Sequence, residues 1–548
     1  MIYFFSDSKL ILGIGLSLSS VIFLMVLSYY TNLKKLKSLL DNKKEILEKE
    51  INFISKGQAS FDSGSEFINN NHPFSSDIDL YGQSSFFQYV NRTVISEAKR
   101  MLASILGANE TGHIFQKQNA IQDLASDPEW RLNFSAKSTL VQQKINHSVI
   151  FDWLKNYKAI IPQYVYWLSF LIKALSLITL GLYIFDYVGY LPLAAVFFTG
   201  LFISSLFVKK INKTSIHLSE LKDTFGNYSD LIAHIENKTF DSDYCQNYKA
   251  KIKSDNIAAS QLMKQFTKYL SALDQRNNIL FAVLGNGLFL WDCTQVYKIE
   301  KWINEHKENV RNWFETIVWF DSQNSLANYS YNHPEFTFPE IIDDPNLLID
   351  ARSLGHFMLD PKKRIDNDFK IDRQNFTVVT GANMAGKSTF LRTVSNSIVS
   401  ANIGLPVCAK HFKYNPIKLI TSMRNTDSLK DDSSYFFAEL SRLKMIIEAI
   451  KIEPYFIILD EILKGTNSKD KEQGSIQLMQ KLSETSSSGL IATHDLGLCE
   501  IEKSLPNITN QYFDAEIVDN ELYFDYTLKN GICQNMNASF LLKKMEII

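Results

Sequence analysis

The chain has 548 residues, of which 45% are hydrophobic and 13% aromatic, so it is long enough for several domains with large buried cores. Its formal net charge of -2 excludes a globally basic nucleic-acid-binding protein, while a local basic patch stays compatible with it. The five cysteines are scattered without any C-x-x-C spacing, which excludes a zinc or disulfide framework and suits a reducing compartment.

Near the N-terminus, the segment from Leu10 to Tyr30 carries no charge and is long enough to span a bilayer, which takes about 20 residues. Lys34, Lys35 and Lys37 follow directly, and the positive-inside rule places that end in the cytoplasm. The alternative is a secretory signal peptide. The long apolar run and the lack of a clear small-residue cleavage site argue against it, so we predict a transmembrane segment.

A second apolar region runs from about 164 to 208 and divides at a short polar break, 185–190. We predict a hairpin of two transmembrane helices with both ends in the cytoplasm, because lysines such as Lys209 and Lys210 follow it. Lys173 falls inside the first span, where a charge is costly unless it snorkels or pairs. A buried hairpin of a soluble helical domain is the alternative. The predicted location is the inner or plasma membrane, multi-pass, with the C-terminal domain in the cytoplasm.

The remaining sequence up to about residue 330 has mainly helical periodicity. Residues 38–60 are charged and helix-prone with one apolar face, and a polar linker follows up to residue 71. Amphipathic patterns then cover 85–157 and 212–320. We therefore predict helical domains on both sides of the hairpin.

A glycine-rich motif follows an apolar, β-branched segment at 376–380, and apolar residues at helical spacing come after it. The motif fits G-x-x-x-x-G-K-[ST], the phosphate-binding P-loop, in its required context of strand, loop and helix. Lys387 would reach the β- and γ-phosphates, and Ser388 would ligate Mg²⁺. The predicted cofactors are ATP and Mg²⁺. The predicted nucleotide-binding residues here are Gly381, Ala382, Asn383, Met384, Ala385, Gly386, Lys387, Ser388 and Thr389.

Two further apolar segments end in polar residues of the kinds that ATP hydrolysis needs. The segment 456–461 ends in Asp460, a predicted Mg²⁺ ligand together with Ser388, and in Glu461, placed to activate the attacking water. The segment 490–495 carries His494 at its carboxyl end. Because ligands sit at the carboxyl ends of parallel strands, the three motifs are predicted to form one site. The predicted catalytic residues are Lys387, Glu461 and His494.

Several of these blocks resemble the MutS family of mismatch-repair ATPases. The family's P-loop reads Gly-Pro-Asn-Met-Gly-Gly-Lys-Ser-Thr, and its internal Asn-Met pair is present at 383–384. An Asn-Asp pair precedes the P-loop strand at 367–368, the stretch 460–467 resembles Asp-Glu-x-x-Arg-Gly-Thr-Ser, and 492–494 matches the Ala-Thr-His switch. The resemblance also includes the start of the helical core, 85–93, and the closing helix near the C-terminus.

The resemblance covers about 72–160 and 209–548. It implies an α/β P-loop NTPase of the ABC type, similar to MutS domain V, joined to an all-α core and lever domain; the transmembrane helices are additional. The predicted domains are a transmembrane segment (1–33), a helical linker (34–71), the first part of the helical core (72–163), the transmembrane hairpin (164–208), the second part of the core with the lever (209–330) and the ATPase (331–548).

The stretch 427–439 resembles the family's signature segment, in which a serine at a helix start reaches the γ-phosphate of the other subunit. Ser434 is the corresponding residue, so the resemblance implies a homodimer with composite ATP sites. The family's glycines are replaced here by Asp431, Asp432 and Ser433, and acids near a phosphate are unfavourable unless they point away. A simple helix N-cap is the alternative role for Ser434.

The family's mismatch-sensing domain, with its Phe-x-Glu wedge, is not expected here, because only a membrane segment and a linker precede Ser85. The letters Phe338-Pro339-Glu340 occur at the start of the ATPase, where we interpret them as chance. The sequence therefore predicts a membrane-anchored, MutS-like ATPase, with DNA as a possible partner. The alternative is an ABC-type transporter or another membrane-complex ATPase that acts on a protein or lipid partner.

Overall fold

The computed structural model describes residues 9–57, 60–141, 147–253, 257–382, 384–423, 435–463, 467–518 and 521–533. The chain divides into two compact units. The first comprises Met1–Ser60, Glu129–Thr239 and Lys249–Val318, and the second comprises Phe61–Pro128, Phe240–Tyr248 and Trp319–Ile548. The segment 61–128, which was predicted as linker up to residue 71 and as helical core from residue 72, therefore groups with the region predicted as the ATPase domain.

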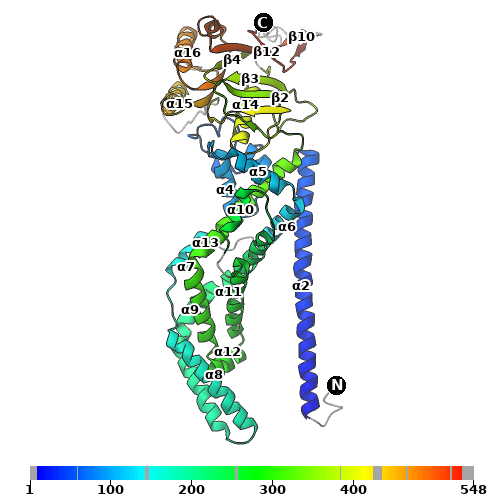
Figure 1. Cartoon of the computed structure of the whole chain (residues 1–548), viewed down its shortest axis with the longest axis vertical. Coiled ribbons are helices and arrows are strands. Elements are labelled where there is room, and N and C mark those ends of the chain that lie inside the picture. Colours follow the sequence, from blue (N-terminus) through cyan, green and yellow to red (C-terminus); the bar gives the residue numbers. More distant parts are fainter. Residues whose placement is uncertain are drawn as a thin grey trace. The chain divides into compact units, whose positions relative to one another are not determined.

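The first unit is helical. Its helices are α2 (Lys9–Lys56), α6 (Pro128–Ser138), α7 (His147–Asn156), α8 (Gln163–Ile184), α9 (Tyr190–Glu236), α11 (Ala259–Asp274), α12 (Ile279–Phe289) and most of α13 (Trp291–Asn332). In Figure 1, α8 and α9 run side by side as a hairpin.

Helix α2 joins the predicted N-terminal span and the charged segment after it into one helix of 48 residues. Neither Gly nor Pro occurs between Leu16 and Lys56, so nothing in the sequence ends the helix where the composition changes from apolar to charged. Several side chains at the start of the predicted span, 10–14 and 16, lie outside the described residues. The span from Leu10 to Tyr30 therefore stays a prediction.

Among the described residues, two helices are long and apolar enough to cross a membrane, Gln163–Ile184 and Tyr190–Ser215. A third candidate arises only if the bent pair of helices Ile279–Phe289 and Trp291–Asn332 counts as one span. Most of their apolar side chains face away from the protein; Phe198 and Phe202, for example, are 66% and 67% exposed. The polar break between them forms the turn. Lys173, the charge within the first span, donates from Nζ to the hydroxyl of Thr294 at 3.1 Å, so it faces protein.

The second unit is a mixed α/β domain with helices packed on it. Its helices are α3 (Phe86–Val90), α4 (Ser96–Gly107), α5 (Ile114–Ala125), α10 (Asp243–Ala250), α14 (Lys387–Asn402), α15 (Tyr435–Ile450) and α16 (Ser468–Ser483). Its strands are β1 (Glu340–Ile341), β2 (Leu347–Leu354), β3 (Asn367–Asp372), β4 (Phe376–Gly381), β5 (His411–Tyr414), β6 (Lys418–Ser422), β7 (Tyr455–Asp460), β8 (Ser488–Ala492), β9 (Ile508–Phe513), β10 (Glu516–Val518), β11 (Glu521–Tyr523) and β12 (Leu528–Asn530).

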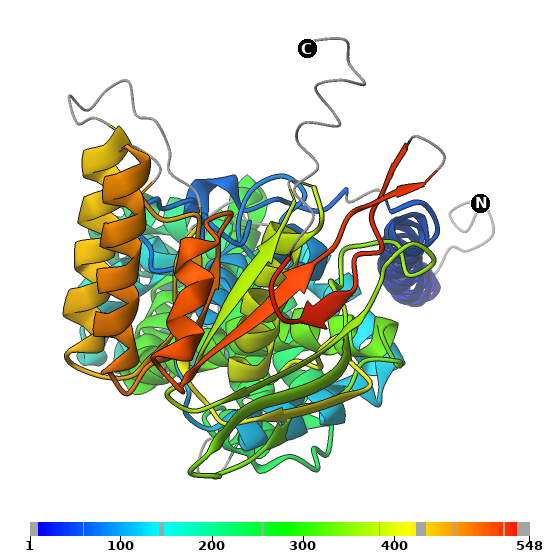
Figure 2. The same cartoon turned by 90° about the horizontal axis from the view of Figure 1, so that it is seen from above.

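The larger sheet has six strands in the order β12-β9-β4-β8-β7-β6. All neighbours pair in parallel except β12 and β9. Strands β4 and β8 are buried along their whole length, which fits their almost continuous apolar sequence. Figure 2 shows α15 and α16 side by side along this sheet. The mixed α/β sheet and the helical majority agree with the predicted fold class.

The segment before α3 is bonded to β6, at the edge of this sheet. The backbone N–H of Thr421 donates to the carbonyl of Pro73 at 2.9 Å, and its hydroxyl donates to Asp77. Arg442 on α15 donates to the same Pro73 carbonyl. These contacts explain why 61–128 belongs to the second unit.

Asp321 links α13 to the start of α4. Its Oδ2 atom accepts hydrogen bonds from the backbone N–H groups of Val94 and Ile95 at 3.0 and 2.8 Å. Burial raises the pKa of this carboxyl group to about 7, while the two donors act in the opposite direction. The group is therefore protonated in the folded chain at pH values at which it is ionised in the unfolded chain.

We expect the contact between α13 and α4 to lose stability as the pH rises from about 4 to about 7, because the unfolded state releases this proton first. Asp321→Asn keeps an oxygen acceptor and cannot ionise, so it should flatten that dependence. Amide hydrogen exchange at residues 94–96, corrected for the intrinsic rate, measures the opening free energy. An equal pH slope in both proteins would contradict this explanation.

Candidate nucleotide-binding site

The order of the strands brings the three predicted motifs together. Strand β4 pairs with β8, and β8 pairs with β7, so the three carboxyl ends are neighbours. In the register, Ala492 at the end of β8 lies opposite Val379 on one side and Asp460 on the other. Lys387, Asp460, Glu461 and His494 therefore meet at one edge of the sheet.

The loop after β4 has backbone angles that favour glycine. Gly381 has φ 147° and Gly386 has φ 106°, and a Cβ atom added at Gly381 would lie 2.6 Å from the carbonyl oxygen of Phe513. Helix α14 begins at Lys387, so its positive end faces the loop. Met384 is exposed, Ala385 is buried, and Asn383 lies outside the described residues.

The amine of Lys387 is held inside its own loop. Nζ donates to the carbonyl oxygens of Gly381 and Ala382 at 2.8 and 3.0 Å. Burial lowers the pKa of Lys387, and the nearby carboxylates Asp460 and Glu461 act in the opposite direction. A phosphate would have to replace these two carbonyls as the partner of the amine.

The predicted metal ligands lie next to each other. The hydroxyl of Ser388 donates to Oδ2 of Asp460 at 2.7 Å. A hydroxyl and a carboxylate are oxygen donors of the kind that Mg²⁺ prefers, and Mg²⁺ commonly takes its other ligands from water and phosphate. Within the described parts of the chain, no group of three or more His, Cys, Asp or Glu could hold a metal ion. The pair therefore fits Mg²⁺ bound together with a nucleotide.

Glu461 and His494 form a close pair, with 2.8 Å between Oε1 of Glu461 and Nε2 of His494. The same nitrogen lies 3.3 Å from Nζ of Lys387. Nε2 can donate to Glu461 when it carries a proton or accept from the Lys387 ammonium when it does not, but it cannot do both. We assign the proton to Nε2 because the contact with Glu461 is the shorter one and Lys387 donates to two carbonyls. Glu461 has φ 52°, and its backbone N–H donates to the carbonyl of Ala492, so the end of β8 fixes this residue.

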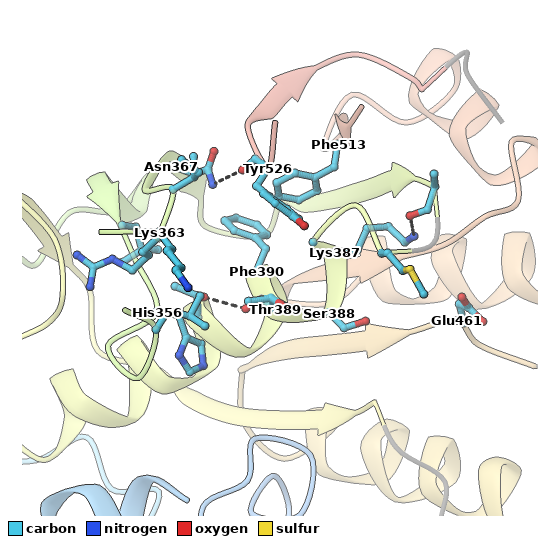
Figure 3. Close-up of a pocket in the computed structure, with 18 residues that line it drawn as sticks. His356, Lys363, Asn367, Lys387, Ser388, Thr389, Phe390, Glu461, Phe513 and Tyr526 are labelled. Carbon is cyan, nitrogen blue, oxygen red and sulfur yellow. Dashed lines mark hydrogen bonds between the residues drawn. The ribbon is translucent and has the colours of Figure 1, made fainter. Parts of the chain in front are cut away.

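A cavity of about 430 Å³ opens beside the loop. Figure 3 shows Lys387, Ser388 and Thr389 on one side of it, with His356 and Lys363 on another. Burial lowers the pKa of His356 to about 4, so its imidazole is neutral near pH 7. The positive charges around the cavity come from Lys363, Arg364 and Lys387.

The residues that line the cavity opposite the P-loop, among them Lys363 and Arg364, were not predicted from the sequence. Lys363 and Arg364 belong to a basic run after Pro361, and this run next to the Asn-Asp pair is the signal that was available. Asn367 of that pair donates to the carbonyl of Tyr526 at 3.0 Å and accepts from the N–H of Leu528 at 2.7 Å. It thereby fixes Tyr526 at the cavity, a contact across about 160 residues that no local pattern predicts.

The signature segment is only partly described. Ser434 lies outside the described residues, so its predicted role stays a prediction. Glu439, five residues after Ser434, lies on α15, is buried, and accepts a hydrogen bond from the backbone N–H of Leu463. The helix after the signature segment is therefore bonded to the loop that follows Glu461.

Comparison with known proteins agrees with this geometry. The geometry defines a P-loop nucleotide-binding domain, and the family described as MutS domain V matches residues 377–544. Similar proteins include MutS protein homolog 4 of Homo sapiens (26% identical over 46% of this chain), DNA mismatch repair protein MSH4 of Arabidopsis thaliana (29% over 40%) and DNA mismatch repair protein MutS of Thermotoga neapolitana (27% over 51%).

The matched region covers 27%, 28% and 34% of those three proteins, so the chain corresponds to about a third of their length or less. The match to MutS domain V, over residues 377–544, nevertheless contains the P-loop, the strand ending at Asp460 and the strand before His494. The resemblance to the MutS family that the residues predicted is therefore confirmed for the region 377–544, which matches MutS domain V.

Ser388→Ala should weaken Mg²⁺-dependent nucleotide binding by on the order of tenfold or more, because it removes one of the two protein oxygens at the metal position. Binding of a fluorescent ATP analogue, titrated with Mg²⁺ and again with EDTA, measures the effect. Ser395→Ala is the matched control on α14, because the Ser395 hydroxyl bonds only within the helix. An equal loss of affinity with and without Mg²⁺ would argue against the metal role of Ser388.

Proposed function

We propose that this protein is a membrane-anchored ATPase that binds Mg·ATP in the cavity beside Lys387 and hydrolyses it. The observation that carries the proposal is the 2.7 Å contact between Ser388 and Asp460 next to the Glu461–His494 pair. The amine of Lys387 and the N-terminal end of α14 would hold the phosphates. Mg²⁺ would neutralise charge on the phosphate oxygens when bound.

In this proposal Glu461 accepts a proton from the attacking water, because its carboxylate lies at the end of β7 beside the predicted phosphate position. His494 donates to Glu461 and so orients it. This contact would rearrange when water and a γ-phosphate enter, since Oε1 of Glu461 now lies 2.8 Å from the histidine. Glu461 is the catalytic base in this mechanism, and His494 senses the phosphate.

We further propose that two copies form a homodimer with composite ATP sites. The support is the match of residues 377–544 to MutS domain V and the hydrogen bond from Leu463, in the loop after Glu461, to Glu439 on α15. In such a dimer, Ser434 would reach the ATP bound to the partner subunit, and α15 would connect this serine to the hydrolytic residues of its own subunit.

Anchoring in the inner or plasma membrane, with the ATPase in the cytoplasm, is proposed for the α8–α9 hairpin. Both helices have the length and composition of a membrane span, and only 17% of the apolar stretch of α8 and 11% of that of α9 are buried in the protein. Lys209 and Lys210 follow the apolar part of α9, as expected for a cytoplasmic end. Apolar side chains exposed over two such helices would be unfavourable in water.

DNA is the proposed partner, because two of the similar proteins are named for DNA mismatch repair. The alternative, an ABC-type transporter, has less support, since the transporter signature Leu-Ser-Gly-Gly-Gln does not occur in the sequence. The remaining alternative is a protein or lipid partner at the membrane, which predicts that added DNA leaves the rate of ATP turnover unchanged.

ATP turnover by the detergent-solubilised full chain should depend on Lys387 and rise when duplex, mismatched or branched DNA is added. Lys387→Ala should abolish both the basal turnover and its stimulation by DNA. Lys363→Ala, on the side of the cavity away from the P-loop, should mainly raise the KM for ATP. Stimulation should fall as the salt concentration rises, because phosphate contacts release counterions. Turnover that ignores every DNA would reject DNA as the partner and leave the ATPase proposal intact.

A further inference from the structure

Helix α12 (Ile279–Phe289) is a third apolar segment of the first unit. Its sequence, ILFAVLGNGLF, has no charge. One face is buried at Gly285, Asn286 and Gly287. The other face exposes Ile279, Leu280, Val283 and Leu284, whose exposed fractions are 79%, 74%, 43% and 54%. An apolar helix face of this kind is unfavourable in water, by about 25 cal/mol for each Å².

The buried face of α12 packs against the proposed membrane hairpin, on both α8 and α9. The backbones touch: a Cβ atom added at Gly200 of α9 would lie 2.1 Å from the carbonyl oxygen of Gly287. Gly287 in turn lies under the ring of Phe197. Close approach through small residues is typical of helix packing in membranes. Gly200 lies inside the span Tyr190–Ser215, so α12 meets the hairpin within its apolar stretch.

The helix ends in a sharp break whose polar backbone groups are bonded to protein. The axis bends by 82° between α12 and α13, and Leu290 at the break has φ 48°. The hydroxyl of Ser176 on α8 donates to the carbonyl of Leu288 at 2.8 Å. Oδ1 of Asn286 accepts from the N–H of Asp292 at 3.0 Å. A break in a helix is tolerated at membrane depth only when other parts of the protein satisfy its backbone in this way.

The charged groups near the break are turned towards protein as well. Arg276 and Asp292 form an ion pair of 3.1 Å, and their side chains are 13% and 6% exposed. Lys173 donates to Thr294, as described above. The outer surface of α12 therefore carries apolar groups, and the charges lie behind it. Buried pairs of this kind are the usual form of ionisable residues within membrane segments.

We propose that α12 is a re-entrant membrane segment, in which lipid acyl chains cover the face formed by Ile279, Leu280, Val283 and Leu284. The inference rests on the proposed membrane anchoring by α8 and α9. Eleven residues extend about 16 Å, roughly half of a 30 Å hydrocarbon core, so α12 enters the bilayer without crossing it. The chain turns at Leu290 and leaves as α13.

The test uses the full chain with single cysteines at Leu280 and Val283, each labelled with the fluorophore NBD in detergent and reconstituted into vesicles of dioleoylphosphatidylcholine. The five native cysteines are buried, so the unsubstituted protein serves as the labelling blank. Phe198→Cys on α9 is the control for the hairpin, and Lys268→Cys, at an exposed position of α11, is the control for water. Replacing the lipid by its counterpart brominated on the acyl chains then measures quenching by lipid.

The proposal predicts a loss of NBD emission at Leu280→Cys and Val283→Cys equal to that at Phe198→Cys, with no loss at Lys268→Cys. If only Phe198→Cys is quenched and both α12 positions behave like Lys268→Cys, the inference is wrong while the membrane anchor stands. Blue-shifted but unquenched emission at both α12 positions would also overturn it, because a protein would then cover the face. If Phe198→Cys is unquenched too, the anchor itself fails. ATP turnover of each variant identifies any that misfolds.

Discussion

The parallel pairing of β4, β8 and β7 is the constraint on which the candidate site depends. Residues more than 100 positions apart, Lys387 and His494, come within 3.3 Å only because their strands are neighbours in register. The same pairing puts Asp460 against Ser388 and aligns Glu461 with the end of β8. A register shift of one residue between β8 and β7 would turn Asp460 to the other face of the sheet and separate it from Ser388.

The sequence was sufficient for the parts of the site that are local. The P-loop, the Asp-Glu pair and the Ala-Thr-His stretch are short contiguous motifs at strand ends, and each fixes its own geometry. The opposite wall of the cavity was missed, because Lys363 and Tyr526 come from loops that are brought together through Asn367. Helix α12 was missed for another reason: at 11 residues it is too short for a span, and its apolar face became visible only once its buried glycines were placed.

Two helices of the described chain, α9 and α13, are unusually long. Helix α9, which comprises the apolar span and the polar sequence after it, has 47 residues and a length of about 70 Å at 1.5 Å per residue. Helix α13 follows the break after α12 and has 42 residues. Helix α13 contains neither Gly nor Pro and so lacks the residues that usually kink a helix, whereas α9 contains Pro192, Gly200 and Gly226. Asp321 lies on the part of α13 that belongs to the second unit, where this helix meets the start of α4.

The most direct test of the central claim is ATP turnover by Glu461→Gln beside Glu484→Gln, an exposed glutamate at the end of α16. If the three strand ends form one hydrolytic site, Glu461→Gln binds Mg·ATP as the unsubstituted protein does but loses turnover by about 100-fold or more, while Glu484→Gln is unaffected. Binding retained together with unchanged turnover would contradict the assignment of Glu461 as the base, and with it the proposed site.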